Sequence, residues 1–236
     1  MKMSDKGLVE LVGHEGVCLS KYKDSVGVWT IGIGATKTEI PDLASWPLSK
    51  KITMQQAFDL LKQGIVKYED ALNKNIKRPI SQTEFDALCS WCYNVGVGWV
   101  SKASVIYKIN FGIHGQDLYD ALMLFQKPKE IIGRRRKEAL LLRDGKYSNN
   151  GKALLFPVSS KGNPVYKAGV EIDVWHYLDA KPAPEIIPTK LQSHEADTVK
   201  QSPPSGGPFT NSAQVDALLK ESWEALKDKL KGWFKR

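Results

Sequence analysis

The chain has 236 residues, 42% of them hydrophobic, so it is long enough to bury a substantial core. Its formal charge of +8 favours an anionic partner, and because no nucleic-acid-binding motif is recognisable, we exclude nucleic acid as that partner. Three cysteines do not make a disulfide framework, and the N-terminus has no apolar run typical of a signal peptide or membrane anchor, which predicts synthesis in a cytoplasm.

The first predicted element is a helix over residues 1–15. Its apolar residues recur at helical spacing until Gly13 and Gly16 interrupt the pattern. Glu15 is therefore expected at or just past the helix end, where its carboxylate can project towards the next element. The neighbouring His14 could tune Glu15, but we favour its interpretation as a simple surface histidine.

A β-hairpin region is predicted over residues 17–36. Short β-branched runs lie on both sides of Gly27, which predicts a tight turn centred on that glycine. In this register Asp24 and Thr30 face each other across the strands, with Cβ atoms roughly 5 Å apart. The two side chains would then be close enough to hold one water molecule.

Glu15 and Asp24 form the kind of carboxylate pair that glycoside hydrolysis requires. One group must protonate the leaving oxygen, and the other must direct water or stabilise an oxocarbenium-like centre. Partial burial would favour the protonated form of Glu15, while Asp24 on an open hairpin would stay ionised. The alternative is that both are ordinary solvated carboxylates.

Helices are predicted for most of the chain up to residue 147. A long amphipathic helix covers 53–76 and begins at Thr53, and several helices follow over 81–147. Ser81 is a suitable N-cap because Glu84 follows three residues later. Three glycines are expected at helix ends: Gly96, Gly98 and Gly112. The fold class predicted is α+β, mostly α-helical with one small β-hairpin region.

Two of the cysteines, Cys89 and Cys92, have a C-x-x-C spacing. They lie within an apolar helical pattern, and no second pair or histidine cluster accompanies them. We therefore interpret them as buried core thiols and expect no metal site.

Three ordered blocks resemble the phage-type lysozyme family, the muramidase endolysins of tailed bacteriophages. The first is HEGVCLSKYKDSVGVWTIGIGAT over 14–36, in which the spacing of Glu15, Asp24 and Thr30 is similar to that family's catalytic triad. The second, QTEFDALCSWCYNVG over 82–96, resembles its central helix. The third, GRRRKEALLLRDGKY over 133–147, resembles its closing arginine-rich helix.

The resemblance implies a lysozyme-like catalytic domain over residues 1–147 that needs no metal or cofactor. Its substrate would be peptidoglycan, cleaved at the β-1,4 bond between N-acetylmuramic acid and N-acetylglucosamine. Glu15 would be the general acid, Asp24 and Thr30 would handle the water, and Arg134 would pair with Glu15. Three further residues would line the saccharide cleft: Thr36, Tyr93 and Asn94.

The sequence changes character after residue 147. Residues 148–180 mix β-branched and aromatic residues and are expected to form short strands in an ordered extension of the catalytic domain. Residues 181–211 are rich in proline and are expected to form a flexible linker.

Residues 212–236 are predicted to form a cationic amphipathic helix that contacts anionic lipid or lipopolysaccharide. The alternative is a helix docked on the catalytic domain or on a second copy of itself. The residues expected to make the lipid contact are Trp223, Lys229, Lys231, Trp233, Phe234, Lys235 and Arg236.

The resemblance implies a bacteriolytic, antimicrobial endolysin for host cell lysis. It would be made in the host cytoplasm and reach the periplasmic peptidoglycan after a holin opens the inner membrane. Three alternatives remain: a virion-associated lysozyme for cell entry, a lytic transglycosylase that needs only a glutamate, and a non-enzymatic cationic membrane-active protein.

Overall fold

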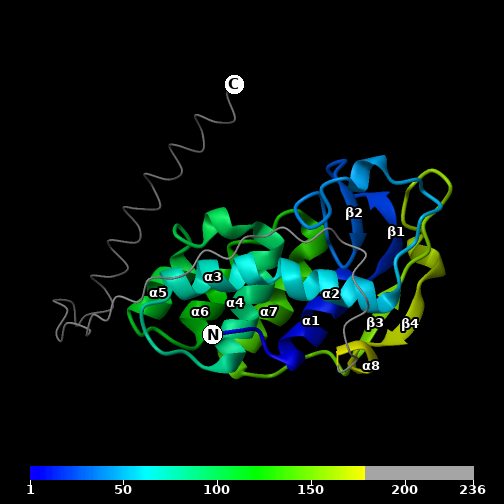
Figure 1. The fold of residues 1–236 in the computed structure, drawn as a ribbon. Coiled ribbons are helices and arrows are strands. Elements are labelled where there is room, and N and C mark those ends of the chain that lie inside the picture. Colours follow the sequence, from blue (N-terminus) through cyan, green and yellow to red (C-terminus); the bar gives the residue numbers. More distant parts are fainter. Residues whose placement is uncertain (179–236) are drawn as a thin grey trace. The chain divides into compact units, whose positions relative to one another are not determined.

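The computed structural model describes residues 1–178, so the predicted linker over 181–211 and the predicted helix over 212–236 lie outside the described residues. The described chain is α+β and mostly helical, with two antiparallel sheets of two strands each (Figure 1). The α-helices are α1 (Asp5–Glu15), α2 (Met54–Gly64), α3 (Val66–Asn75), α4 (Gln82–Val95), α5 (Ser104–Asn110), α6 (Gln116–Met123), α7 (Ile132–Asp144) and α8 (Trp175–Leu178). The strands are β1 (Cys18–Lys23), β2 (Trp29–Gly32), β3 (Lys152–Leu155) and β4 (Val170–Asp173). Within residues 1–178, no helix is long and apolar enough to cross a membrane.

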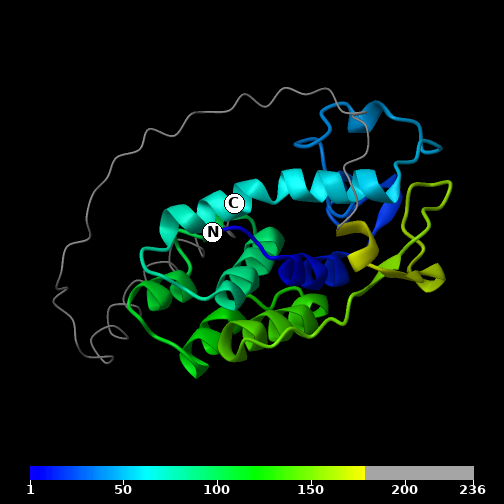
Figure 2. The same cartoon turned by 60° about the horizontal axis from the view of Figure 1, so that its bottom comes forward.

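Two helices begin with reciprocal capping bonds, as their sequences predict. The Thr53 hydroxyl accepts from the Gln56 N–H while the Gln56 side chain accepts from the Thr53 N–H, and Ser81 and Glu84 repeat the arrangement. The predicted helix over 53–76 is nearly continuous: Figure 2 shows α2 and α3 as one long cyan helix. The interruption falls at Ile65, whose φ of −69° and ψ of −27° are still helical.

Two of the three glycines predicted to end helices do so. Gly96 caps α4 with a φ of 89°, and Gly112 follows α5 with a φ of 78°, conformations that L-residues with side chains rarely adopt. The prediction for Gly98 is wrong, because this residue lies inside a short 3₁₀ helix, Val97–Trp99. That turn places Trp99 edge-on against Phe125, with ring centroids 5.4 Å apart.

The hairpin forms, but its predicted register is wrong. Tyr22 pairs with Thr30, and the Asp24 N–H donates to the Val28 carbonyl, so the turn centres one residue before Gly27. Asp24 and Thr30 are therefore diagonal neighbours on the two strands instead of direct partners. Diagonal neighbours have Cα atoms about 7–8 Å apart, which leaves more room between the side chains than the predicted pairing.

The Asp24 side chain explains this register. Its Oδ1 accepts from the N–H groups of Val26, at 3.0 Å, and Val28, at 2.8 Å, so the carboxylate closes the turn from inside. Gly27 has a φ of 84° and supplies the positive φ within this loop, although it is not the loop's centre.

Helix α4 lies at the centre of the described fold and packs against α1, α3 and α7. Its Trp91 is fully buried and meets Phe125 edge to face, with ring centroids 5.1 Å apart. Cys89 and Cys92 are free and buried on the same helix, as predicted. Burial raises the pKa of Cys92 to about 12, so this thiol stays protonated and packs as a small apolar group.

The segment after α7 forms the predicted short strands and packs against the start of the chain. The Val17 N–H donates to the Leu154 carbonyl, and the Phe156 N–H donates to the Val17 carbonyl. Glu10 of α1 is buried and accepts from the Asn149 N–H. The strands β3 and β4 consequently lie beside the end of α1 and next to β1 in both views (Figures 1 and 2).

Candidate functional site

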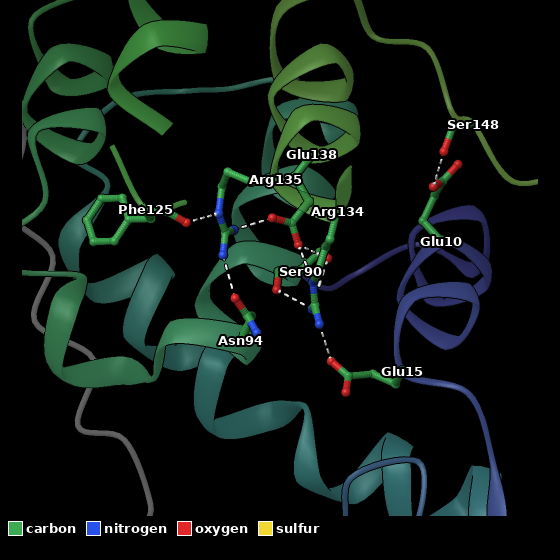
Figure 3. A network of polar contacts seen from close by, with 9 residues as sticks. All are labelled: Glu10, Glu15, Ser90, Asn94, Phe125, Arg134, Arg135, Glu138 and Ser148. Atoms are coloured by element: carbon green, nitrogen blue, oxygen red, sulfur yellow. Dashed lines mark hydrogen bonds and ion pairs between the residues drawn. The ribbon is translucent and has the colours of Figure 1, made fainter. Parts of the chain in front are cut away.

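Glu15 is the last residue of α1, as its sequence context predicts. Gly16, with a φ of 69°, ends the helix and donates its N–H to the Val12 carbonyl at 2.8 Å. The Glu15 side chain is 23% exposed, and its Oε1 accepts from Arg134 Nη1 at 2.5 Å (Figure 3). The expected pairing of Glu15 with Arg134 is therefore present in the structure.

Arg134 is held by three partners on three elements. In addition to Glu15, its Nε donates to Glu138 Oε1 at 2.8 Å and its Nη2 donates to the Ser90 carbonyl at 3.0 Å. Burial disfavours the charged guanidinium, but Glu15 and Glu138 outweigh that effect and raise the pKa of Arg134. This side chain is therefore a fixed cation that joins α7 to α4 and to the end of α1.

Glu138 is the buried centre of this network. Its side chain is 1% exposed and accepts from Arg134, from Arg135 and from the Ser90 hydroxyl, the last at 2.6 Å. The network therefore contains two arginines, Arg134 and Arg135, and two glutamates, Glu15 and Glu138, so its charges balance. Buried charges are tolerated only when they are paired in this way. The GRRRKE stretch contains these residues at helical spacing, but the sequence alone did not single out Arg135, Glu138 or Ser90 as members of the site.

Asp24 and Thr30 lie at the end of the hairpin. Thr30 is 4% exposed and its hydroxyl donates to the Val28 carbonyl at 3.2 Å. Both turn N–H groups bind Oδ1 of Asp24, and within residues 1–178 no group bonds to Oδ2. This leaves one carboxylate oxygen for a water molecule.

Tyr22 on β1 was not singled out from the sequence. It pairs with Thr30 across the hairpin. Burial, followed by the charges of Cys18 and Glu15, raises the pKa of its phenol. An aromatic residue two positions before Asp24 on a strand was the available signal, because side chains two apart share one face.

Tyr93 and Thr36, predicted to line a saccharide cleft, both make bonds within the chain. The Tyr93 hydroxyl donates to the Ile33 carbonyl at 2.6 Å and so ties α4 to the end of the hairpin. Burial, followed by Glu15, raises the pKa of Tyr93 well above its usual value. Thr36 donates its N–H to Glu39 at 2.9 Å. Tyr93 is therefore fixed against the end of the hairpin, while Thr36 is fixed by its own turn.

Asn94, the third residue predicted to line the cleft, is exposed and belongs to the arginine network. Its Oδ1 accepts from Arg135 Nη2 (Figure 3). Arg135 also donates from Nε to the Phe125 carbonyl at 2.9 Å. The position of Asn94 is thus set by a fully buried cation.

His14 differs from the surface residue that we expected, because it is half-buried at the end of α1. Burial, followed by the charges of Arg134, Lys137 and Arg135, lowers its pKa to about 3. The imidazole is therefore neutral at the pH of living cells and adds no charge beside Glu15.

Comparison with known proteins matches the part of the chain that contains this site. The family model for phage lysozyme matches residues 12–140. The endolysin of Salmonella phage P22 is 34% identical over 146 residues, which are 60% of this chain and 97% of that protein. The endolysin from Escherichia coli O157:H7 phage FAHEc1 has a structure that superposes with a TM-score of 0.56 at 31% identity, covering 63% of this chain and 98% of that one. The crystal structure of a P22 lysozyme mutant superposes with a TM-score of 0.54 at 32% identity, and the match covers 60% of this chain and 98% of that one. The β3–β4 segment lies beyond the residues that the family model matches.

Proposed function

Because this chain belongs to the phage lysozyme family and is a lysozyme-type peptidoglycan hydrolase, we propose that Glu15 and Asp24 are the carboxylates that cleave its substrate. The bond is the β-1,4 linkage between N-acetylmuramic acid and N-acetylglucosamine. The observation that carries the proposal is the position of Glu15, fixed by Arg134 at a helix end beside the hairpin that ends in Asp24.

Glu15 is the general acid in this proposal. In the free protein Arg134 Nη1 donates to Glu15 Oε1 and so holds the carboxyl group in place. Arg134 also donates to Glu138, which fixes the guanidinium itself. The neutral His14 places no further positive charge beside Glu15.

Asp24 and Thr30 position the attacking water. Asp24 Oδ1 is occupied by two amide N–H groups, so Oδ2 accepts the proton of the water. The Thr30 hydroxyl donates to a carbonyl, which leaves its oxygen lone pairs to accept from the same water. The resemblance to phage-type lysozymes implies inversion at the sugar, which requires carboxyl groups about 6.5–9.5 Å apart so that this water fits between them.

The test is hydrolysis of purified peptidoglycan by the wild type, Glu15→Gln and Asp24→Asn, with mass spectrometry of the new sugar ends. We expect reducing N-acetylmuramic acid ends, and rates lower by about 10²-fold or more in both variants. Glu130→Gln, an exposed glutamate, is the matched control and should leave the rate unchanged. Anhydro ends would identify a lytic transglycosylase, and lysis that persists without Glu15 would identify a non-enzymatic killer.

We also propose that the protein is made in the host cytoplasm and reaches the periplasm through a holin. Phage endolysins act on peptidoglycan after release, and this supports the order of events. Expression in a bacterial host with and without a holin tests the route through culture turbidity. Lysis at the same rate without the holin would contradict it, and detection in purified virions would favour a role in entry.

A contact with anionic lipid or lipopolysaccharide is proposed for residues 212–236. The support is the sequence alone, which places Lys229, Lys231 and Lys235 among tryptophan, phenylalanine and leucine residues. Sedimentation with anionic and neutral vesicles, before and after deletion of 212–236, measures the contact. Equal binding of the truncated and full-length proteins would contradict it.

A further inference from the structure

The segment after α7 touches the chain next to both proposed catalytic carboxylates. Phe156 packs against Gly16, the residue after Glu15, so closely that a Cβ there would lie 2.6 Å from the ring. The Lys23 N–H, directly before Asp24, donates to the Gly162 carbonyl at 3.1 Å. Residues 152–173, which we call the β-extension, are therefore part of the surroundings of the catalytic centre.

Tyr166 is an unusual residue in the β-extension. It begins a 3₁₀ helix, Tyr166–Ala168, and its ring meets Phe156 edge to face with centroids 5.2 Å apart. Despite this contact, the residue is 70% exposed. An aromatic ring fixed by packing on one edge and open to solvent elsewhere loses little conformational entropy when it binds a ligand.

Phe156 places Tyr166 near the proposed catalytic residues, because its ring contacts both Gly16, the residue after Glu15, and the ring of Tyr166. Tyr166 also follows Gly162 by four residues, and the Gly162 carbonyl accepts from the Lys23 N–H directly before Asp24. Tyr166 is thus beside the site and is not one of its charged members.

We propose that Tyr166 forms an additional glycan subsite, in which its exposed ring stacks on a pyranose ring of the strand cleaved between Glu15 and Asp24. The apolar C–H face of a pyranose matches an aromatic face, and the phenol can bond to a sugar hydroxyl. The inference rests on the proposed function, because the occupant is the hydrolase's own glycan strand. The β-extension follows residues 12–140, which the phage lysozyme family model matches.

The experiment compares Tyr166→Ala and Tyr166→Phe on peptidoglycan glycan strands of increasing length. For long strands we expect Tyr166→Ala to raise KM about tenfold, equivalent to about 1.4 kcal/mol, with kcat changed less than about twofold. Tyr166→Phe keeps the ring and should restore most of the affinity. Fragments too short to reach Tyr166 should show no difference between the three proteins.

Tyr107→Ala is the matched control, because it removes another exposed tyrosine, on α5 at the opposite end of the described fold (Figure 1). It should leave KM for every strand length unchanged. Thermal unfolding of both alanine variants identifies any loss of folding. A Tyr166→Ala protein with wild-type KM on long strands, or a Tyr166→Phe protein as weak as Tyr166→Ala, would overturn the subsite.

Binding without turnover separates this inference from the proposed function. Calorimetric titration of long strands into Glu15→Gln, and into Glu15→Gln combined with Tyr166→Ala, should show about tenfold weaker binding for the double variant. This difference is expected whatever chemistry the wild type performs. Equal affinities would overturn the subsite, whereas an inactive wild type would contradict only the catalytic roles.

Discussion

Arg134 binds Glu15 although 119 residues separate them in the chain. The contact brings α7 onto the end of α1, so the proposed acid is positioned by the last helix of the family-matched segment. Glu138 holds Arg134 from the opposite side, and the position of Glu15 therefore depends on a buried network that substrate need not touch.

Replacing Arg134 tests this dependence. Among residues 1–178, Arg134→Gln leaves Glu138 with one cationic partner and Glu15 with none. We therefore expect the free energy of unfolding to fall by about 3–5 kcal/mol and the rate of hydrolysis to fall with it. Urea unfolding and peptidoglycan turnover measure the two effects. Arg136→Gln, an exposed neighbour on α7, should change stability by less than about 0.5 kcal/mol. Equal stability of the two variants would contradict the prediction.

Ser90 tests the buried carboxylate separately. Ser90→Ala removes the 2.6 Å hydrogen bond from the hydroxyl to Glu138, and hydrogen bonds to charged groups contribute about 1.5–3 kcal/mol. We expect a loss of that size in the free energy of unfolding. Ser101→Ala, at an exposed position, is the matched control. A loss no larger than that of the control would show that Glu138 is satisfied by its arginines alone.

The lowered pKa of His14 should make the protein less stable at acidic pH. Its folded pKa of about 3 lies below the ordinary histidine pKa of 6.5, so between these pH values the unfolded chain binds more protons. Stability should therefore fall as pH drops below 6.5, with His14 contributing up to about 1.4 kcal/mol per pH unit.

His14→Gln removes this titration and should flatten the dependence, as measured by urea unfolding at pH 7, about 5.5 and about 4.5. His176→Gln removes an exposed histidine and should keep the wild-type slope. An identical slope for His14→Gln and the wild type would contradict the lowered pKa.

Gly162 tests the contact between the β-extension and the hairpin. Its φ is 77°, and an added Cβ would lie 3.2 Å from a Leu48 methyl and 3.4 Å from the Trp29 ring. Gly162→Ala should therefore lower the free energy of unfolding by about 1–3 kcal/mol, measured by thermal or urea unfolding. Gly133→Ala, in α7 with open space around it, should raise stability by about 0.5–1 kcal/mol. A neutral Gly162→Ala would contradict a tight contact.

Local signals in the sequence predicted much of the fold. The starts of α2 and α4 follow from Thr53 and Ser81, because both capping bonds form between residues three positions apart. Glu15 at a helix end follows from Gly16 in the same way. Features set by neighbours a few residues away are visible in the sequence, since the interacting groups lie within one turn.

Two kinds of feature were not predictable in this way: those in which two local preferences compete, and those that join residues distant in the chain. The hairpin register was misplaced because Asp24 closes the turn with its own side chain, and this outweighs the preference of Gly27 for the centre. The bond from Ser90 on α4 to Glu138 on α7 joins residues 48 positions apart, and no local pattern pairs them. The pairing of Arg134 with Glu15 was expected only through the family resemblance.

The anchoring of α1 determines when the enzyme can become complete during its synthesis. Asn149 donates to the Val9 carbonyl across 140 residues, and Arg134 reaches back to Glu15 across 119. The first helix to leave the ribosome is therefore among the last to acquire its partners, a long-range topology of the kind that slows folding. A nascent chain that has not yet delivered α7 lacks Arg134, so the contact that fixes the proposed acid cannot form until more than half of the chain has been synthesised.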